Sequence, residues 1–113
     1  MLIVFEALSK LNKKIRLTEI QWAHIELKHK ELRNQIQKMI GTLENPDSIY
    51  YSPAEEIYHY YKYFKETPVT EKYLLLVVKH LNDEGYIITA FFVTRIRKEG
   101  KEVKYEKENI HKL

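Results

Sequence analysis

The 113-residue chain contains no cysteine, so it has neither a disulfide framework nor thiolate ligands for a metal. It also lacks any apolar run long enough to span a bilayer, since the longest, residues 73–78 and 86–93, have the length of strands. No basic segment precedes the apolar start, as a secretory signal would require. Repeats, low-complexity segments and Gly/Ser linkers are absent as well. We therefore expect one cytoplasmic domain over residues 1–113 with no membrane contact.

Charge is unevenly distributed, although the formal net charge is only +3. Residues 10–38 contain eight Lys or Arg against three Asp or Glu, and residues 95–113 contain seven against four. Residues 44–84 reverse the balance, with four basic and eight acidic side chains. A basic surface attracts a polyanion such as RNA. The alternative is that these charges belong to ordinary solvated faces of helices and hairpins.

A helical region is predicted after Thr18. Thr18-x-x-Gln21 has the form of a capping box, in which a hydroxyl and an amide satisfy backbone N–H groups where a helix begins. An apolar stripe with steps of three and four residues follows, and it predicts either one long helix ending near Pro46 or two helices joined near Lys30. The stripe consists of Trp22, Ile25, His29, Leu32, Ile36, Met39, Ile40 and Leu43.

Strands are expected on both sides of this helical region. Residues 2–8 and 13–17 form two short candidates. Beyond Pro46, runs of β-branched and aromatic residues alternate with turn signals, and two hairpin-type loops, residues 82–85 and 98–101, contain glycine where a positive φ is cheap. Five strands are predicted there, at residues 48–52, 57–64, 72–81, 86–97 and 102–106. The sequence therefore predicts an α+β fold, with N-terminal helices packed on one face of an antiparallel β-meander.

Four short motifs occur in a distinctive order: Trp22-x-His24-Ile25, His29-x-Glu31-Leu32, Asn45-Pro46-Asp47 and Tyr86-Ile-Ile-Thr89-Ala90. From residue 18 to residue 100 this order resembles a family of phage and mobile-element nuclease-like domains. That family belongs to the superfamily of barnase, EndoU, the tRNA-cleaving colicins and RelE, with BrnT-type toxins as distant relatives. The resemblance implies a RelE/barnase-like fold and a toxin-like ribonuclease that needs no metal or cofactor. The chain departs from the family at Lys30, where relatives often carry proline.

The resemblance also implies partners and a mechanism. RNA would be the substrate, cleaved by attack of its own 2′-hydroxyl, and an antitoxin protein would be a further partner. Two other classes stay open: a catalytically inactive RNA- or ribosome-binding module, and a protein-interaction domain of a phage or mobile element. The residues that carry over as catalytic candidates are His24, His29, Thr89 and Arg95.

His24 is the strongest of these candidates. It lies off the apolar stripe and one turn before Lys28, a candidate RNA-binding residue, so an imidazole and an ammonium are expected together. Imidazole exchanges a proton near neutral pH and therefore suits a general base or acid. The alternative is a surface or capping histidine. Its acid or base partner stays open between a tyrosine and His59.

His29 favours a structural interpretation. On a continuous helix it would point about 140° away from His24, so the two would not share a site. Its place on the stripe suggests a buried imidazole bonded to backbone at a corner between helices. The five-residue spacing is not the i,i+4 pair of a helical zinc site, and together with the lack of cysteine it predicts no metal site.

Thr89 and Arg95 share a strand face by parity, about 20 Å apart in an extended strand. We therefore expect Thr89 to contact the reacting phosphate and Arg95 a neighbouring one. The opposite face should point to the helices, and its members are Ile88, Ala90, Phe92, Thr94 and Ile96.

Six of the nine tyrosines fall between residues 50 and 63. Tyr58 and Tyr60 share one face of a predicted strand, and exposed rings there could stack on unpaired bases, which makes both candidate RNA-binding residues. The alternative is packing, because tyrosine has a high strand propensity and half-buries well.

Overall fold

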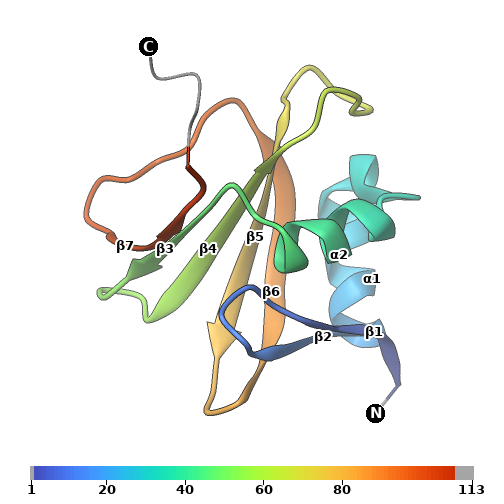
Figure 1. Cartoon of the computed structure of the whole chain (residues 1–113). Helices are drawn as coiled ribbons and strands as arrows, with labels where there is room; N and C mark the ends of the chain where they lie inside the picture. Colours follow the sequence, from blue (N-terminus) through green and yellow to red (C-terminus); the bar gives the residue numbers. More distant parts are fainter. Residues whose placement is uncertain (1, 109–113) are drawn as a thin grey trace.

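One seven-stranded sheet, with two helices on one of its faces, makes up the computed structural model, which describes residues 2–108 (Figure 1). The strand order is β1-β2-β6-β5-β4-β3-β7. In chain order the elements are β1 (Ile3–Leu8), β2 (Lys14–Thr18), α1 (Glu19–Lys28), a 3₁₀ turn η1 (Lys30–Leu32), α2 (Ile36–Glu44), β3 (Ser48–Ser52), β4 (Ile57–Tyr63), β5 (Tyr73–His80), β6 (Glu84–Val93) and β7 (Glu102–Glu106). The α+β class is confirmed.

The middle of the sheet is the predicted antiparallel meander, because β3, β4, β5 and β6 pair in sequence. The N-terminal hairpin of β1 and β2 is also confirmed. Two expectations were wrong. Strand β2 pairs with β6 in parallel, which makes the sheet mixed, and β7 pairs with β3 at the far edge instead of forming a hairpin with β6.

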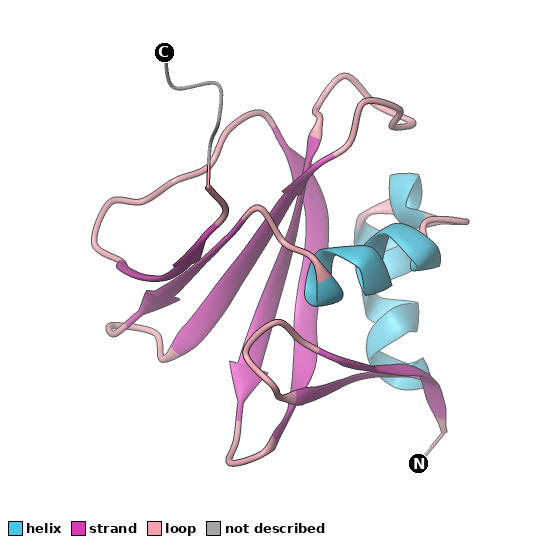
Figure 2. Ribbon diagram, viewed as in Figure 1, coloured by secondary structure: helices cyan, strands magenta, loops and turns pink. Residues whose placement is uncertain are grey.

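The segment of residues 94–101, here called the crossing segment, explains the position of β7. Strand β6 ends at Val93, and the crossing segment then passes over the sheet face opposite the helices (Figure 2). Ile96 packs into the apolar cluster on that face, and the Arg97 N–H donates to the Tyr61 hydroxyl at 3.4 Å. The loop expected at residues 98–101 is therefore part of a crossover between the two sheet edges, with Gly100 at a φ of +72°.

The helical region consists of two helices with a break between them, one of the two predicted arrangements. Thr18 caps α1, since its hydroxyl accepts the Gln21 N–H at 3.2 Å. The second half of the predicted capping box does not form, because the Gln21 side chain donates to the Ile88 carbonyl instead. Helix α1 ends at Lys28 without a proline, and His29 leaves the helical conformation at φ −131° and ψ 74°.

A bulge in β6 changes which residues face the helices. Val77 pairs with Thr89 and Val78 pairs with Ile87, which leaves Ile88 as an extra residue. Ala90 and Phe92 face the helices as predicted, but Ile87 takes the place expected for Ile88. Ile88 and Ile96 pack on the opposite face, with a cluster built on Tyr50, Tyr61, Leu75 and Val77.

Gly85 is required by close packing where β2 joins β6, not by a positive φ as its loop position suggested. It lies within β6, and a Cβ atom there would clash with the Lys79 carbonyl and lie 2.8 Å from Ile15 Cδ1.

Tyr58 and Tyr60 lie on the helix side of the sheet and pack around His80. Tyr60 is fully buried, and its hydroxyl bonds His80 Nε2 at 2.9 Å. The ring of Tyr58 stacks on His80 with centroids 3.7 Å apart. Burial raises the pKa of Tyr60 to about 12 and lowers the pKa of His80 to about 4, so both are neutral at pH 7. Packing, the alternative given for the tyrosines, describes Tyr60.

His59 has a partly buried imidazole that makes no hydrogen bond within residues 2–108. Both of its ring nitrogens are shielded from solvent, and neither has a partner within residues 2–108. Burial, followed by the charge of Lys101, lowers the pKa of His59, so the ring is neutral at pH 7. A desolvated polar group of this kind costs free energy that folding does not recover.

Replacing His59 with leucine should therefore stabilise the protein. We expect His59→Leu to raise the free energy of unfolding by about 1 kcal/mol, because it replaces an unsatisfied polar side chain with an apolar one. Urea unfolding at pH 7 measures this. The control is His80→Leu, which should destabilise because the buried Tyr60 hydroxyl loses its hydrogen bond to the His80 ring. A loss of stability in His59→Leu would contradict the account.

Candidate active site

A pocket of about 580 Å³ lies between α1 and the bulge of β6. This volume falls within the range of about 300–1,000 Å³ that is usual for small-molecule sites. Its walls combine imidazole, ammonium, amide and hydroxyl groups with an aromatic ring. They are formed by Gln21, His24, Ile25, Lys28, His29, Ile88, Thr89 and Phe91.

The pocket forms where α1 is hydrogen-bonded to the bulge of β6. Strand β2 covers only residues 84–86 of β6, so within residues 2–108 the remainder of that edge has no neighbouring strand. Helix α1 packs there, and its Gln21 amide donates to the Ile88 carbonyl at the bulge. The Thr18 cap fixes where the helix begins. It therefore also fixes which helix residues line the pocket together with Thr89.

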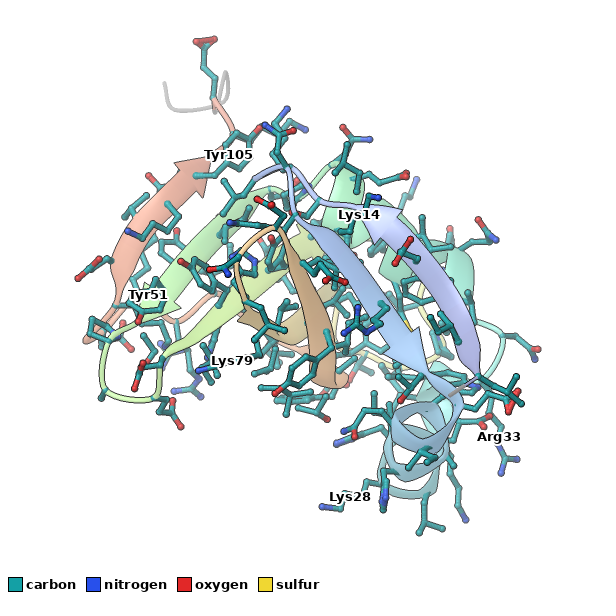
Figure 3. All side chains as sticks on the ribbon, turned by 90° about the horizontal axis from the view of Figure 1, so that it is seen from below. Lys14, Lys28, Arg33, Tyr51, Lys79 and Tyr105 are labelled. Atoms are coloured by element: carbon teal, nitrogen blue, oxygen red, sulfur yellow. The ribbon has the colours of Figure 1, made fainter. Side chains whose placement is uncertain are left out.

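His24 and Lys28 come from adjacent turns of α1 and are both exposed. Within residues 2–108 neither side chain has a hydrogen bond or an ion pair, which leaves both available to a ligand. Figure 3 shows Lys28 on the outer surface of the helical region. Both side chains line one pocket, as an imidazole and an ammonium one helical turn apart.

The expectation for His29 was wrong in its geometry. Its side chain is 29% exposed, and it is the backbone N–H, not the ring, that bonds the Ile25 carbonyl. The ring stacks on Phe91 with centroids 5.1 Å apart, and Nδ1 lies 3.7 Å from a Glu31 carboxylate oxygen. Because α1 ends before His29, the ring turns toward the pocket that also contains His24.

Thr89 joins this group, whereas the other candidates lie elsewhere. Arg95 is exposed, two residues beyond the end of β6, and does not line the pocket. Tyr58 borders a separate cavity of about 160 Å³ with His80, and the fully buried Tyr60 offers no ring face to a base. Four of the seven candidates therefore come together, namely His24, Lys28, His29 and Thr89.

Gln21 and Phe91 are among the pocket residues that sequence reasoning missed. Gln21 was assigned only to the helix cap, although its side chain reaches a residue 67 positions away. Phe91 was placed on the correct strand face but was not expected beneath a histidine. Capping patterns and strand parity are local signals, so neither identifies such a partner.

Two features are absent from residues 2–108. No group of three or more His, Cys, Asp or Glu side chains there is arranged to hold a metal ion. No helix in that part of the chain has the length and apolar character needed to cross a membrane. Comparisons with protein-family models, with curated proteins and with solved structures give no significant match.

The tie between α1 and the bulge can be tested by removing one donor. We expect Gln21→Met, which keeps the length of the side chain but cannot donate, to lower the free energy of unfolding by about 1 kcal/mol. Backbone hydrogen exchange should become faster in the first turns of α1 and around Thr89, because the helix is less firmly held. Gln37→Met is the matched control, since Gln37 is exposed on α2. Equal effects of the two substitutions would show that the Gln21 bond is unimportant.

Proposed function

We propose that the protein is a metal-independent endoribonuclease whose active site is the pocket between α1 and β6. The observation that carries the proposal is the presence of two imidazoles, an ammonium and a hydroxyl around one cavity, supplied by His24, His29, Lys28 and Thr89. Transesterification of RNA needs these groups: a base, an acid, and donors that stabilise a phosphorane.

The reaction is an in-line displacement at phosphorus. One imidazole removes the proton from the ribose 2′-hydroxyl, and the 2′-oxygen attacks the adjacent phosphate. The bond between phosphorus and the 5′-oxygen breaks, and the second imidazole gives a proton to that oxygen. The products are a 2′,3′-cyclic phosphate and a 5′-hydroxyl. His24 and His29 form the acid and base pair, and the nearby Glu31 carboxylate orients the His29 ring.

Lys28 and Thr89 stabilise the charge that develops on the phosphate. A free ammonium attracts the phosphorane oxygens, and a hydroxyl donates to one of them, so both contacts strengthen in the transition state. The ring of Phe91, already stacked with His29, gives the pocket an apolar wall beside the nucleotide. Arg95 holds a neighbouring phosphate outside the pocket. The resemblance to toxin-like nucleases leads us to add that expression slows bacterial growth and that an antitoxin protein restrains the activity.

The test is cleavage of a fluorescent RNA that contains an unpaired loop, in the presence of EDTA. We expect the parent protein to release fragments with cyclic phosphate ends, identified by mass spectrometry. His24→Ala and His29→Ala should each lower the single-turnover rate by about a hundredfold or more. Thr89→Val should slow cleavage with little change in RNA affinity, because its contact forms mainly in the transition state.

Lys28→Ala has a matched control in Lys104→Ala, which removes one ammonium from β7 at the opposite end of the sheet order. Both variants lose one positive charge, but only the first should reduce the cleavage rate. RNA that is bound and not cleaved by the parent protein would contradict the nuclease proposal and favour an RNA-binding module. Absence of both binding and cleavage would favour a protein-interaction domain.

A further inference from the structure

Two tyrosines, one half exposed and one partly buried, form a pair on the sheet face opposite the helices. Tyr63 ends β4, Tyr73 begins β5, and the two residues are opposite each other in the register of these strands. Their rings meet edge to face, with centroids 5.6 Å apart at 71°. Tyr63 is 50% exposed, and among the described residues neither ring is part of an apolar core cluster. Packing of the core therefore does not account for this pair.

The pair lies on the same sheet face as Phe91 in the pocket wall. Tyr73 is opposite Val93, and Leu75 is opposite Phe91, so the rows of side chains on this face run in order toward the pocket. Along β6 the distance from Thr89 to Val93 is about 13 Å for four extended residues. A nucleotide held in the pocket is therefore too far away to touch the tyrosine pair. The next nucleotides of the same RNA chain can reach it.

We propose that Tyr63 and Tyr73 form a second base-binding subsite, which holds a single-stranded RNA segment leading out of the pocket. This inference rests on the proposed function and specifies its substrate as unpaired RNA of several nucleotides. A half-exposed tyrosine ring offers a face on which any base can stack. Bases within a duplex are already stacked and paired, so duplex RNA would not use the subsite.

Arg95 supplies a positive charge near the expected path of the RNA between the pocket and the tyrosine pair. Arg95 follows Val93 by two residues, is exposed, and its side chain makes no hydrogen bond or ion pair within residues 2–108. Its guanidinium is therefore free to bind a phosphate of that strand.

The tyrosines on the other sheet face are less suitable for a base. The ring of Tyr58 lies against His80 at 3.7 Å and against Tyr51 at 4.8 Å, and Lys104 stands over the ring of Tyr51 at 5.6 Å. A face of the Tyr58 ring is already covered by a stacked partner, whereas Tyr63 and Tyr73 meet only edge to face. Tyr51→Ala is therefore a suitable control, because it removes a partly exposed tyrosine from the opposite face.

The experiment measures binding of 2′-O-methyl oligonucleotides, which lack the nucleophilic hydroxyl and cannot be cleaved by this mechanism. We expect Tyr63→Ala to weaken binding of a single-stranded hexanucleotide by about tenfold, and to leave binding of a dinucleotide unchanged. Tyr63→Phe should bind the hexanucleotide as the parent does, since it keeps the ring. Tyr51→Ala should have no effect, and fluorescence anisotropy gives all these affinities. Thermal unfolding checks that each variant is folded.

The outcomes separate the subsite from the nuclease. If the parent cleaves RNA and folded Tyr63→Ala and Tyr73→Ala both bind the hexanucleotide normally, the subsite is wrong and the proposed function stands. If Tyr63→Ala loses affinity for the hexanucleotide alone while the parent does not cleave RNA, the subsite stands within a binding module. Equal losses for the dinucleotide and the hexanucleotide would overturn the subsite, because the tyrosine would then act on the pocket itself.

Discussion

The hydrogen bond from the Gln21 amide to the Ile88 carbonyl is the contact on which the candidate site depends. The bulge in β6 supplies that carbonyl at an edge where β2 no longer provides a neighbouring strand. Because no ladder bond within residues 2–108 uses this carbonyl, it can accept the Gln21 amide and anchor helix α1. Because Gln21 and His24 belong to the same helix, the Gln21 bond also holds His24 in the pocket that Thr89 lines. The bulge thus determines both the shape of the pocket and which residues line it.

The end of α1 has an equally large effect on the chemistry available. A continuous helix would separate the two imidazoles by about 140°, whereas the break after Lys28 turns His29 onto Phe91 and into the same pocket. His29 is therefore a partly exposed residue with a ring partner, not a buried corner residue. His59 and His80 are partly buried as well, and burial is the main cause of the lowered pKa of each.

Local signals in the sequence predicted most of the elements. The Thr18 cap, the N-terminal hairpin and the meander from β3 to β6 follow from capping chemistry, turn residues and strand propensity. The failures all involve contacts between distant segments. Nothing in the order of residues 84–93 marks Ile88 as a bulge, and that one extra residue reverses the facing of part of β6. Likewise, the parallel pairing of β2 with β6 and the path of the crossing segment are decided by tertiary packing.

The central claim is that two imidazoles share one phosphate-binding pocket, and histidine ring NMR tests it most directly. A titration with uridine 3′-monophosphate, at constant pH, follows each imidazole separately. We predict that the ring signals of His24 and His29 shift together and saturate at the same ligand concentration. The signals of His59 and His80, which do not line the pocket, should not move. A shift in only one of the pocket histidines, or none in either, would contradict the account.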